Sequence, residues 1–98
     1  MFARLTTFQI KTDKIEEGID LYNKSVVPAL KSQKGFKKTY LLVNDKTGDG
    51  VSIGLWETET DVLASEQNLF YQEQLIKFLD LLSDPTYIRE DYEVKVKT

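Results

Sequence analysis

The stretch from Gly35 to Glu57 constrains the fold most, because it predicts a β-hairpin with a helix on either side. Residues 36–44 and 51–56 are rich in the β-branched and aromatic residues that favour strands. Between them, residues 45–50 read DKTGDG, a run of turn-forming residues with two glycines that tolerate positive φ. A hairpin in the middle of the chain means that the other elements must pack around it.

The segment before the hairpin predicts a strand followed by a helix. Residues 2–10 alternate in a strand pattern that puts Arg4, Thr6 and Phe8 on one face, and apolar residues on both faces indicate a central strand. We expect Thr12 or Asp13 to cap the helix that follows. Spacings of three and four residues give this helix one apolar face, made of Ile15, Ile19, Tyr22, Val26 and Leu30. Pro28 should loosen its last turn, and Gly35 should end the segment.

The segment after the hairpin predicts a broken helical region and a final strand. Thr58 and Asp61 resemble a capping box at its start, and the helical pattern runs to about Leu82 with a break near Asn68. Residues 83–85 read SDP and stop the helix, and residues 87–97 predict the last strand.

The order β, α, β, β, α, β predicts an α+β fold of the ferredoxin-like, split βαβ type. We expect residues 1–98 to form a single domain, with a four-stranded antiparallel sheet and the helices on one of its faces. The helices can cover only one side of the many apolar strand residues, which are Leu5, Leu41, Val43, Ile53, Leu55, Ile88 and Val94. A homodimer, in which two sheets close into a dimeric α/β barrel, would cover the other side.

Composition excludes several classes of function. The chain has no cysteine and no histidine, so disulfides, thiol catalysis, and the commonest general base and metal ligand are absent. We therefore expect no metal site. A formal net charge of −3 argues against nucleic-acid binding. Neither a signal peptide nor a membrane span is visible, and we expect a cytoplasmic protein with no membrane partner.

Three short motifs carry a family resemblance: Val27-Pro28-Ala29-Leu30, Gly35-Phe36, and Leu55-Trp56-Glu57. With the element order around them, the chain resembles the antibiotic biosynthesis monooxygenase (ABM) family along nearly its whole length. The resemblance implies a homodimeric α/β barrel with a pocket between each sheet and its helices. It also implies several possible activities, among them oxidation of anthrone- or quinol-type aromatics by molecular oxygen with no metal or flavin cofactor.

The chain departs from the haem-degrading members of that family. Those members use a helix histidine and a first-strand asparagine, whereas this chain has no histidine and has Thr6 and Thr7 on its first strand. These departures argue against haem degradation. Cofactor-independent oxygenation remains chemically feasible, because a readily deprotonated substrate can itself reduce oxygen while the protein binds the anion and excludes water.

Strand faces and helix stripes, together with the polar first-strand position and the tryptophan that the resemblance implies, give the candidate substrate-binding residues, which are Arg4, Thr6, Phe8, Tyr22, Trp56 and Tyr71. In this hypothesis the aromatic residues form a wall, and Arg4 or a tyrosine hydroxyl stabilises an oxyanion. Each also has a structural interpretation. Arg4 can pair with Glu90 or Asp91 instead, and Trp56 can fill the space beneath a helix.

The sequence leaves three functions open. The chain is a cofactor-independent monooxygenase for a small aromatic metabolite, a non-catalytic dimeric module that binds a small apolar ligand, or a barrel with no functional ligand. The absence of histidine and cysteine favours the last two, since the best general bases are missing.

Overall fold

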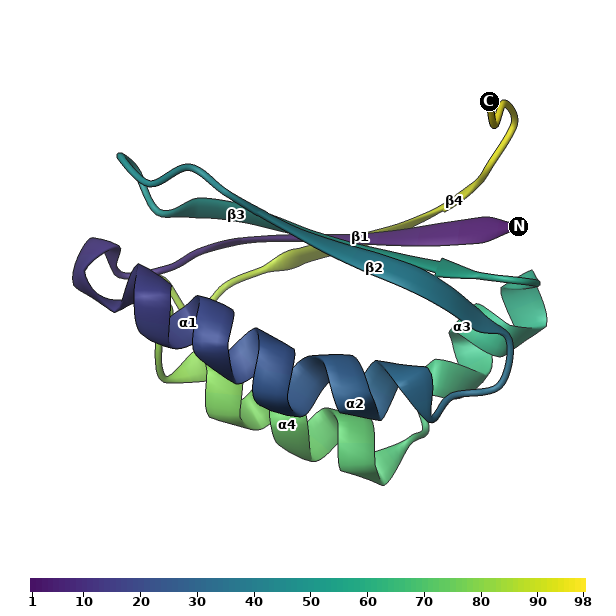
Figure 1. Cartoon of the computed structure of the whole chain (residues 1–98), viewed down its shortest axis with the longest axis horizontal. Coiled ribbons are helices and arrows are strands. Elements are labelled where there is room, and N and C mark those ends of the chain that lie inside the picture. The colour runs from purple at the N-terminus through teal and green to yellow at the C-terminus, as the bar shows by residue number, and fades with distance from the viewer.

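The computed structural model describes residues 1–98 as one antiparallel sheet with helices on a single face (Figure 1). The sheet has the spatial order β2-β3-β1-β4. Its strands are β1 (Phe2–Gln9), β2 (Phe36–Val43), β3 (Asp49–Trp56) and β4 (Ile88–Glu93). The helices are α1 (Ile15–Leu21), α2 (Val27–Lys31), α3 (Glu59–Ser65) and α4 (Leu69–Leu79). This element order confirms the predicted α+β, ferredoxin-like fold.

β1 is a central strand, as its two apolar faces predicted, and it pairs with β3 on one side and β4 on the other. Its register places Arg4 opposite Gly54 of β3 and Asp91 of β4, so these three residues share the face that points toward the helices. Thr6 and Phe8 follow on the same face. We call this the inner face of the sheet.

The first helical layer keeps its predicted apolar stripe but starts differently. Residues Thr12–Lys14 form a 3₁₀ turn, and no side chain caps either this turn or α1, so the predicted cap at Thr12 or Asp13 is wrong. Between α1 and α2 lies η2 (Tyr22–Val26), a turn of π-helix. It ends two residues before Pro28, which stands in the first turn of α2, and the last turn that Pro28 was predicted to loosen is regular α-helix.

The hairpin forms as predicted, but an irregularity at Lys37 changes which β2 residues face the helices. The register shifts between Phe36, which is opposite Trp56, and Lys38, which is opposite Leu55. One extra residue in β2 reverses the alternation beyond it. Leu41 and Val43, which we expected to need cover from a second sheet, therefore point toward the helices, and Tyr40 and Leu42 point away with about half of their surface exposed.

Side-chain caps divide the second helical region as predicted. The Thr58 hydroxyl accepts a hydrogen bond from the Asp61 backbone N–H and starts α3, and Asn68 Oδ1 accepts one from the Tyr71 N–H and starts α4. α4 ends at Leu79, somewhat before the predicted end at Leu82. The last strand is also shorter than predicted, because β4 spans only residues 88–93.

The core lies between the inner face and the two long helical segments. Its fully buried side chains include Ile10 from the end of β1, Val26 and Leu30 from the first layer, Val62 from α3, and Trp56 from β3. The opposite, outer face of the sheet has no covering element (Figure 1). No helix is both long and apolar enough to cross a membrane.

Candidate functional site

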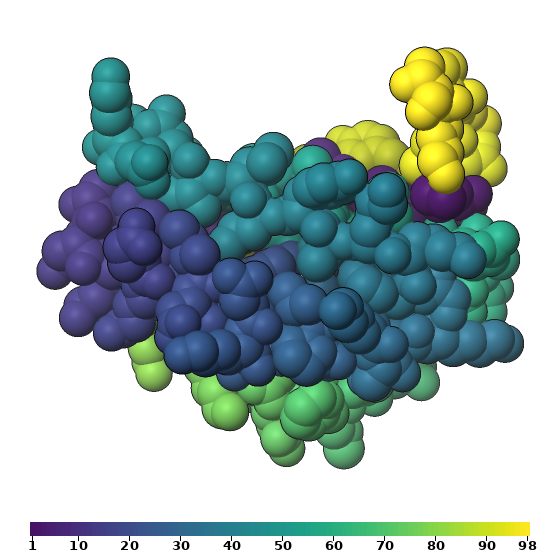
Figure 2. Space-filling model, in the orientation of Figure 1, coloured from purple at the N-terminus to yellow at the C-terminus, as the bar shows by residue number.

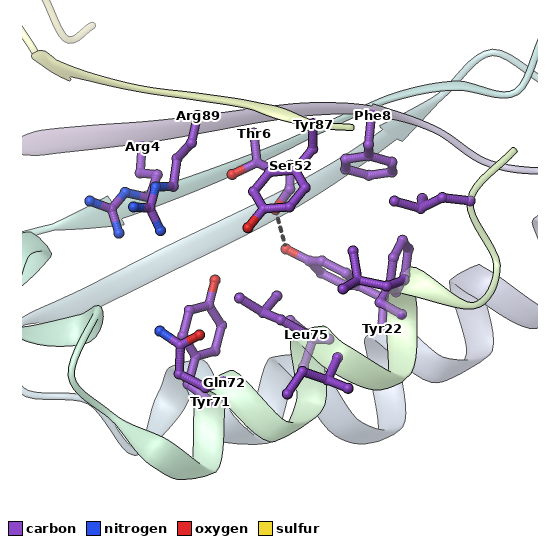
Figure 3. A pocket seen from close by; sticks show the side chains of 15 residues that line it. Arg4, Thr6, Phe8, Tyr22, Ser52, Tyr71, Gln72, Leu75, Tyr87 and Arg89 are labelled. Carbon is purple, nitrogen blue, oxygen red and sulfur yellow. Dashed lines mark hydrogen bonds between the residues drawn. The ribbon is translucent and has the colours of Figure 1, made fainter. Parts of the chain in front are cut away.

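A cavity of about 120 Å³ lies between the inner face of the sheet and α4 (Figure 3). Ten of its 15 lining residues are hydrophobic. Phe8 of β1 meets Phe78 of α4 edge to face, with ring centroids 5.4 Å apart, and Leu75 and Leu79 continue the apolar wall along α4. A concave, mostly apolar space with a few polar groups is the usual form of a small-molecule site.

Five of the six sequence-predicted site residues line this cavity: Arg4, Thr6, Phe8, Tyr22 and Tyr71. The strand face that groups the first three therefore borders the helices, as expected. The helix stripes bring the two tyrosines to the same space from η2 and α4.

Trp56 stands apart from this group and belongs to the core. Its side chain is 1% exposed, and its indole N–H donates to Gln33 Oε1 at 3.2 Å. The ring packs against Phe36 with centroids 5.5 Å apart. It also lies over Gly54, where a Cβ would come within 2.6 Å of the ring. The small residues on this face of β3 thus give room to the indole ring itself at Gly54, and open space remains only near Ser52.

Arg4 is 4% exposed and joins three elements at the polar end of the cavity. Its Nε and Nη2 donate to the two carboxylate oxygens of Asp91 at 2.7 and 2.9 Å, and Nη2 also donates to Glu66 Oε1 at 2.6 Å. Burial disfavours the charge on Arg4, but the hydrogen bonds and attraction of Asp91 and Glu66 outweigh it, and the pKa of Arg4 is raised. The hydrogen bond from Arg4 in turn lowers the pKa of Asp91.

Arg89 is a second cation at this end, and the sequence reasoning missed it. Its Nη2 lies 3.1 Å from Glu66 Oε1, the oxygen that also accepts from Arg4. Arg89 and Tyr87 are more exposed than Arg4 and line the opening of the cavity. The signal was present, because Tyr87, Arg89 and Asp91 alternate along the last strand and so share one face.

Tyr71 carries the most strongly perturbed acid in the cavity wall. Burial raises the pKa of Tyr71 to about 12, and the positive charges of Arg4 and Arg89 offset this only in part. Its hydroxyl makes no hydrogen bond to another lining residue (Figure 3). At neutral pH Tyr71 is therefore a neutral O–H group that is free to donate to a ligand.

The Tyr22 hydroxyl, unlike that of Tyr71, makes two hydrogen bonds within the protein. It hydrogen-bonds with Thr39 Oγ1 at 2.5 Å. It also bonds Ser52 Oγ at 2.8 Å, as Figure 3 shows. The ring meets Phe78 edge to face, with centroids 6.4 Å apart. Tyr22 is the first residue of η2, and π-helical turns of this kind are frequent where a helix positions a functional side chain.

The lining residues suit an aromatic ligand with an oxygen substituent. Phenylalanine and leucine side chains offer faces and edges to a ring, and Tyr71 and Arg89 offer hydrogen-bond donors to an anionic oxygen. No three side chains of the acidic, histidine or cysteine type gather in a way that could hold a metal ion.

No protein family model and no curated protein matches the sequence. Solved structures do match in fold. SnoaB from Streptomyces nogalater, described as a cofactor-independent oxygenase, superimposes as a variant with a TM-score of 0.79 at 12% identity, over 98% of this chain and 94% of that one. An antibiotic biosynthesis monooxygenase gives 0.77 at 15% identity, over 96% and 98%. A conserved protein from Methanosarcina mazei gives 0.80 at 15% identity, over 96% and 92%. The chain therefore has the fold of the antibiotic biosynthesis monooxygenases, as its resemblance to that family predicted.

Proposed function

We propose that this chain binds a small aromatic hydroxy compound in the cavity and oxidises it with molecular oxygen, without a metal or an organic cofactor. The observation that carries the proposal is the neutral hydroxyl of Tyr71, which faces a largely apolar cavity beside two arginines and has no partner in its wall. Likeness in fold to a cofactor-independent oxygenase agrees with this choice.

The donors would act on the ligand oxygen. A phenolate oxygen placed at the polar end accepts hydrogen bonds from Tyr71 and Arg89, and these bonds stabilise the anion more than the neutral phenol. Arg4 is already bonded to Asp91 and Glu66 through Nε and Nη2, and its Nη1 lies 3.5 Å from Ser65 Oγ, so we assign it the role of holding β4 and α3 in position. The cavity thus lowers the pKa of the bound phenol, and the proton leaves to water at the opening.

The anion supplies the electrons for the reaction. One electron passes from the phenolate to oxygen, and the resulting superoxide and phenoxyl radical combine at a ring carbon that carries hydrogen. This recombination forms a peroxide on the ring carbon. Loss of the hydrogen on that carbon as a proton, together with cleavage of the O–O bond, releases water and leaves a carbonyl oxygen on the ring. The phenol plus one oxygen molecule gives a quinone plus one water, so one oxygen atom enters the product. The apolar wall excludes water from the radical pair.

Oxygen consumption with a panel of phenols and hydroquinones tests the proposal, after subtraction of the uncatalysed oxidation. Tyr71→Phe removes one oxyanion donor and should lower kcat by about 100-fold, with little change in folding because the hydroxyl has no partner in the cavity wall. Tyr92→Phe is the matched control, since the Tyr92 hydroxyl bonds only Glu90 away from the cavity and the substitution keeps the ring that the dimer proposed below would bury. Equal oxygen consumption by all three proteins would contradict the role of Tyr71.

A second candidate, a non-catalytic module for the same ligands, is favoured by a specific observation. The polar lining residues are arginines, hydroxyl residues and a glutamine, so no free carboxylate stands ready as a general base. Saturable binding of a phenol to the wild type without oxygen uptake would select this function.

We also propose that the chain works as a homodimer paired through the outer face of the sheet. That face carries exposed apolar side chains from the two edge strands, which are Tyr40 and Leu42 of β2 and Ile88 and Tyr92 of β4. The β2–β3 turn and the C-terminal segment rise on either side of it (Figure 2). A second sheet seated between these projections would bury a patch of a kind that isolated proteins rarely expose.

A further inference from the structure

Tyr22 stands between two hollows of the protein. On one side is the cavity described above, of about 120 Å³, which Tyr22 lines together with Ser52 and Phe78. On the other side is an open cleft of about 340 Å³ beneath the edge strand β2, which Tyr22 lines together with Thr39 and Leu41. No other residue lines both.

The Tyr22 ring is held in this position from both ends. Its hydroxyl bonds Ser52, which belongs to the cavity, and Thr39, which belongs to the cleft, so the two bonds join β3 and β2 across the ring. Its backbone begins the π-helical turn η2, and the side chain is only 6% exposed. These restraints hold the Tyr22 ring in one rotamer, in which it closes the space behind the cavity.

The cavity has room for one ring between Tyr22 and the opening. A cavity of about 150 Å³ lined by apolar side chains holds a single benzene molecule in another protein, and the volume here is about 120 Å³. Substituents on that ring can extend only through the opening, where the exposed side chains of Ile76, Tyr87 and Arg89 lie. A second fused ring on the inner side would meet Tyr22.

We propose that Tyr22 is the specificity-determining residue of this site and limits its aromatic ligand to one ring, by separating the cavity from the cleft under β2. The inference rests on the proposed function in one respect, that the ligand is aromatic. The inference goes beyond the proposed function by restricting the ligand to monocyclic phenols. Without the Tyr22 ring, the cavity and the cleft would join into one space able to hold a fused two-ring compound.

Binding of phenol and of 2-naphthol, followed by methyl NMR, tests this without any need for turnover. In the wild type, phenol should shift the Leu75 and Leu79 methyl signals and leave those of Leu41 and Val43 in the cleft unchanged. 2-Naphthol should bind about tenfold more weakly or worse, because overfilling a packed space is costly. In Tyr22→Ala, 2-naphthol should bind at least as well as phenol and shift both sets of methyls.

Tyr22→Phe is the matched control, because it removes the hydroxyl bonds and keeps the ring that forms the wall. It should retain the preference for phenol. Tyr22→Leu serves as a second variant should Tyr22→Ala not fold, and it should relax the preference in the same direction.

The outcomes separate this inference from the proposed function. Selective phenol binding that Tyr22→Ala relaxes, with no oxygen uptake by any protein, would uphold the partition and refute the oxygenase. Wild-type binding of 2-naphthol as tight as that of phenol would overturn the partition whatever the oxygen measurement gives. Failure of both compounds to bind any of the proteins would overturn it too.

Discussion

At the scale of single residues, Arg4 shows why a charged side chain on a strand resists assignment from sequence. The sequence allowed Arg4 either to pair with the last strand or to face a ligand. In the structure Arg4 pairs with Asp91 of β4 and also borders the cavity, because the Arg4 and Asp91 side chains lie on the inner face of the sheet, where the cavity is. Alternation could place Arg4 on that face, but the partners depend on which strand lies beside β1 and where α3 ends.

The bond between Arg4 and Asp91 predicts a pH-dependent part of the stability. The pKa of Asp91 is lower in the folded state than its ordinary value of 3.8, so its contribution is complete above that value and is lost as pH falls through the lower folded pKa. Asp91→Asn should therefore lower the free energy of unfolding by about 1–3 kcal/mol at pH 7. The difference from the wild type should shrink below about pH 4.

Urea unfolding of both proteins at pH 7 and at pH 3 would measure this difference. Asp20→Asn is the control, because the Asp20 carboxylate pairs only with exposed Lys24, at 3.1 Å, and should matter little at either pH. A difference between wild type and Asp91→Asn that stays constant with pH would show that the Arg4 pair does not stabilise the fold through the Asp91 charge.

At the scale of elements, alternation and capping motifs predicted the order and type of the strands and helices. Alternation and capping motifs did not predict two irregularities. The extra residue at Lys37 reversed the faces of β2, so Leu41 and Val43 point inward, and the π-helical turn aligned Tyr22 with two strands. Each is a displacement by one residue that depends on tertiary packing, and a local pattern carries no mark of it. At the site, five of the six candidates line the cavity, whereas Trp56 fills the core and Arg89 was overlooked.

The turn between α2 and β2 depends on Gly35. Its φ of +77° is strained for any residue with a Cβ, and a Cβ there would lie 2.0 Å from Asp61 Oδ2. Its carbonyl also accepts from the Glu57 N–H at 2.8 Å, which ties the start of the hairpin to its end. Gly35→Ala should lower the free energy of unfolding by more than about 2 kcal/mol.

Gly18→Ala is the matched control for that measurement by chemical denaturation. A Cβ at Gly18 would meet Ile10 at an ordinary 3.4 Å, inside a helix that favours alanine, so the change should lie within about 1 kcal/mol of the wild type. Equal effects of the two substitutions would contradict the account of Gly35.

At the scale of the whole molecule, the proposed dimer makes a prediction about assembly. Leu42 points to the outer face and is 51% exposed in the single chain, so Leu42→Asp should leave the chain folded and yet convert a dimer to a monomer. Light scattering after gel filtration would measure the mass. Leu63→Asp, at an equally exposed position on α3, should leave the dimer intact. A monomeric wild type at micromolar concentration would refute the dimer.

The alternation of β1 has a consequence for how relatives of this chain can diverge. Arg4, Thr6 and Phe8 face the cavity, and their immediate neighbours Leu5 and Thr7 face the other way. A substitution at one position therefore changes the shape of the cavity without touching the outer face, and a substitution one position along does the reverse. The proposed ligand preference and the proposed self-association can thus change independently through substitutions within a single eight-residue strand.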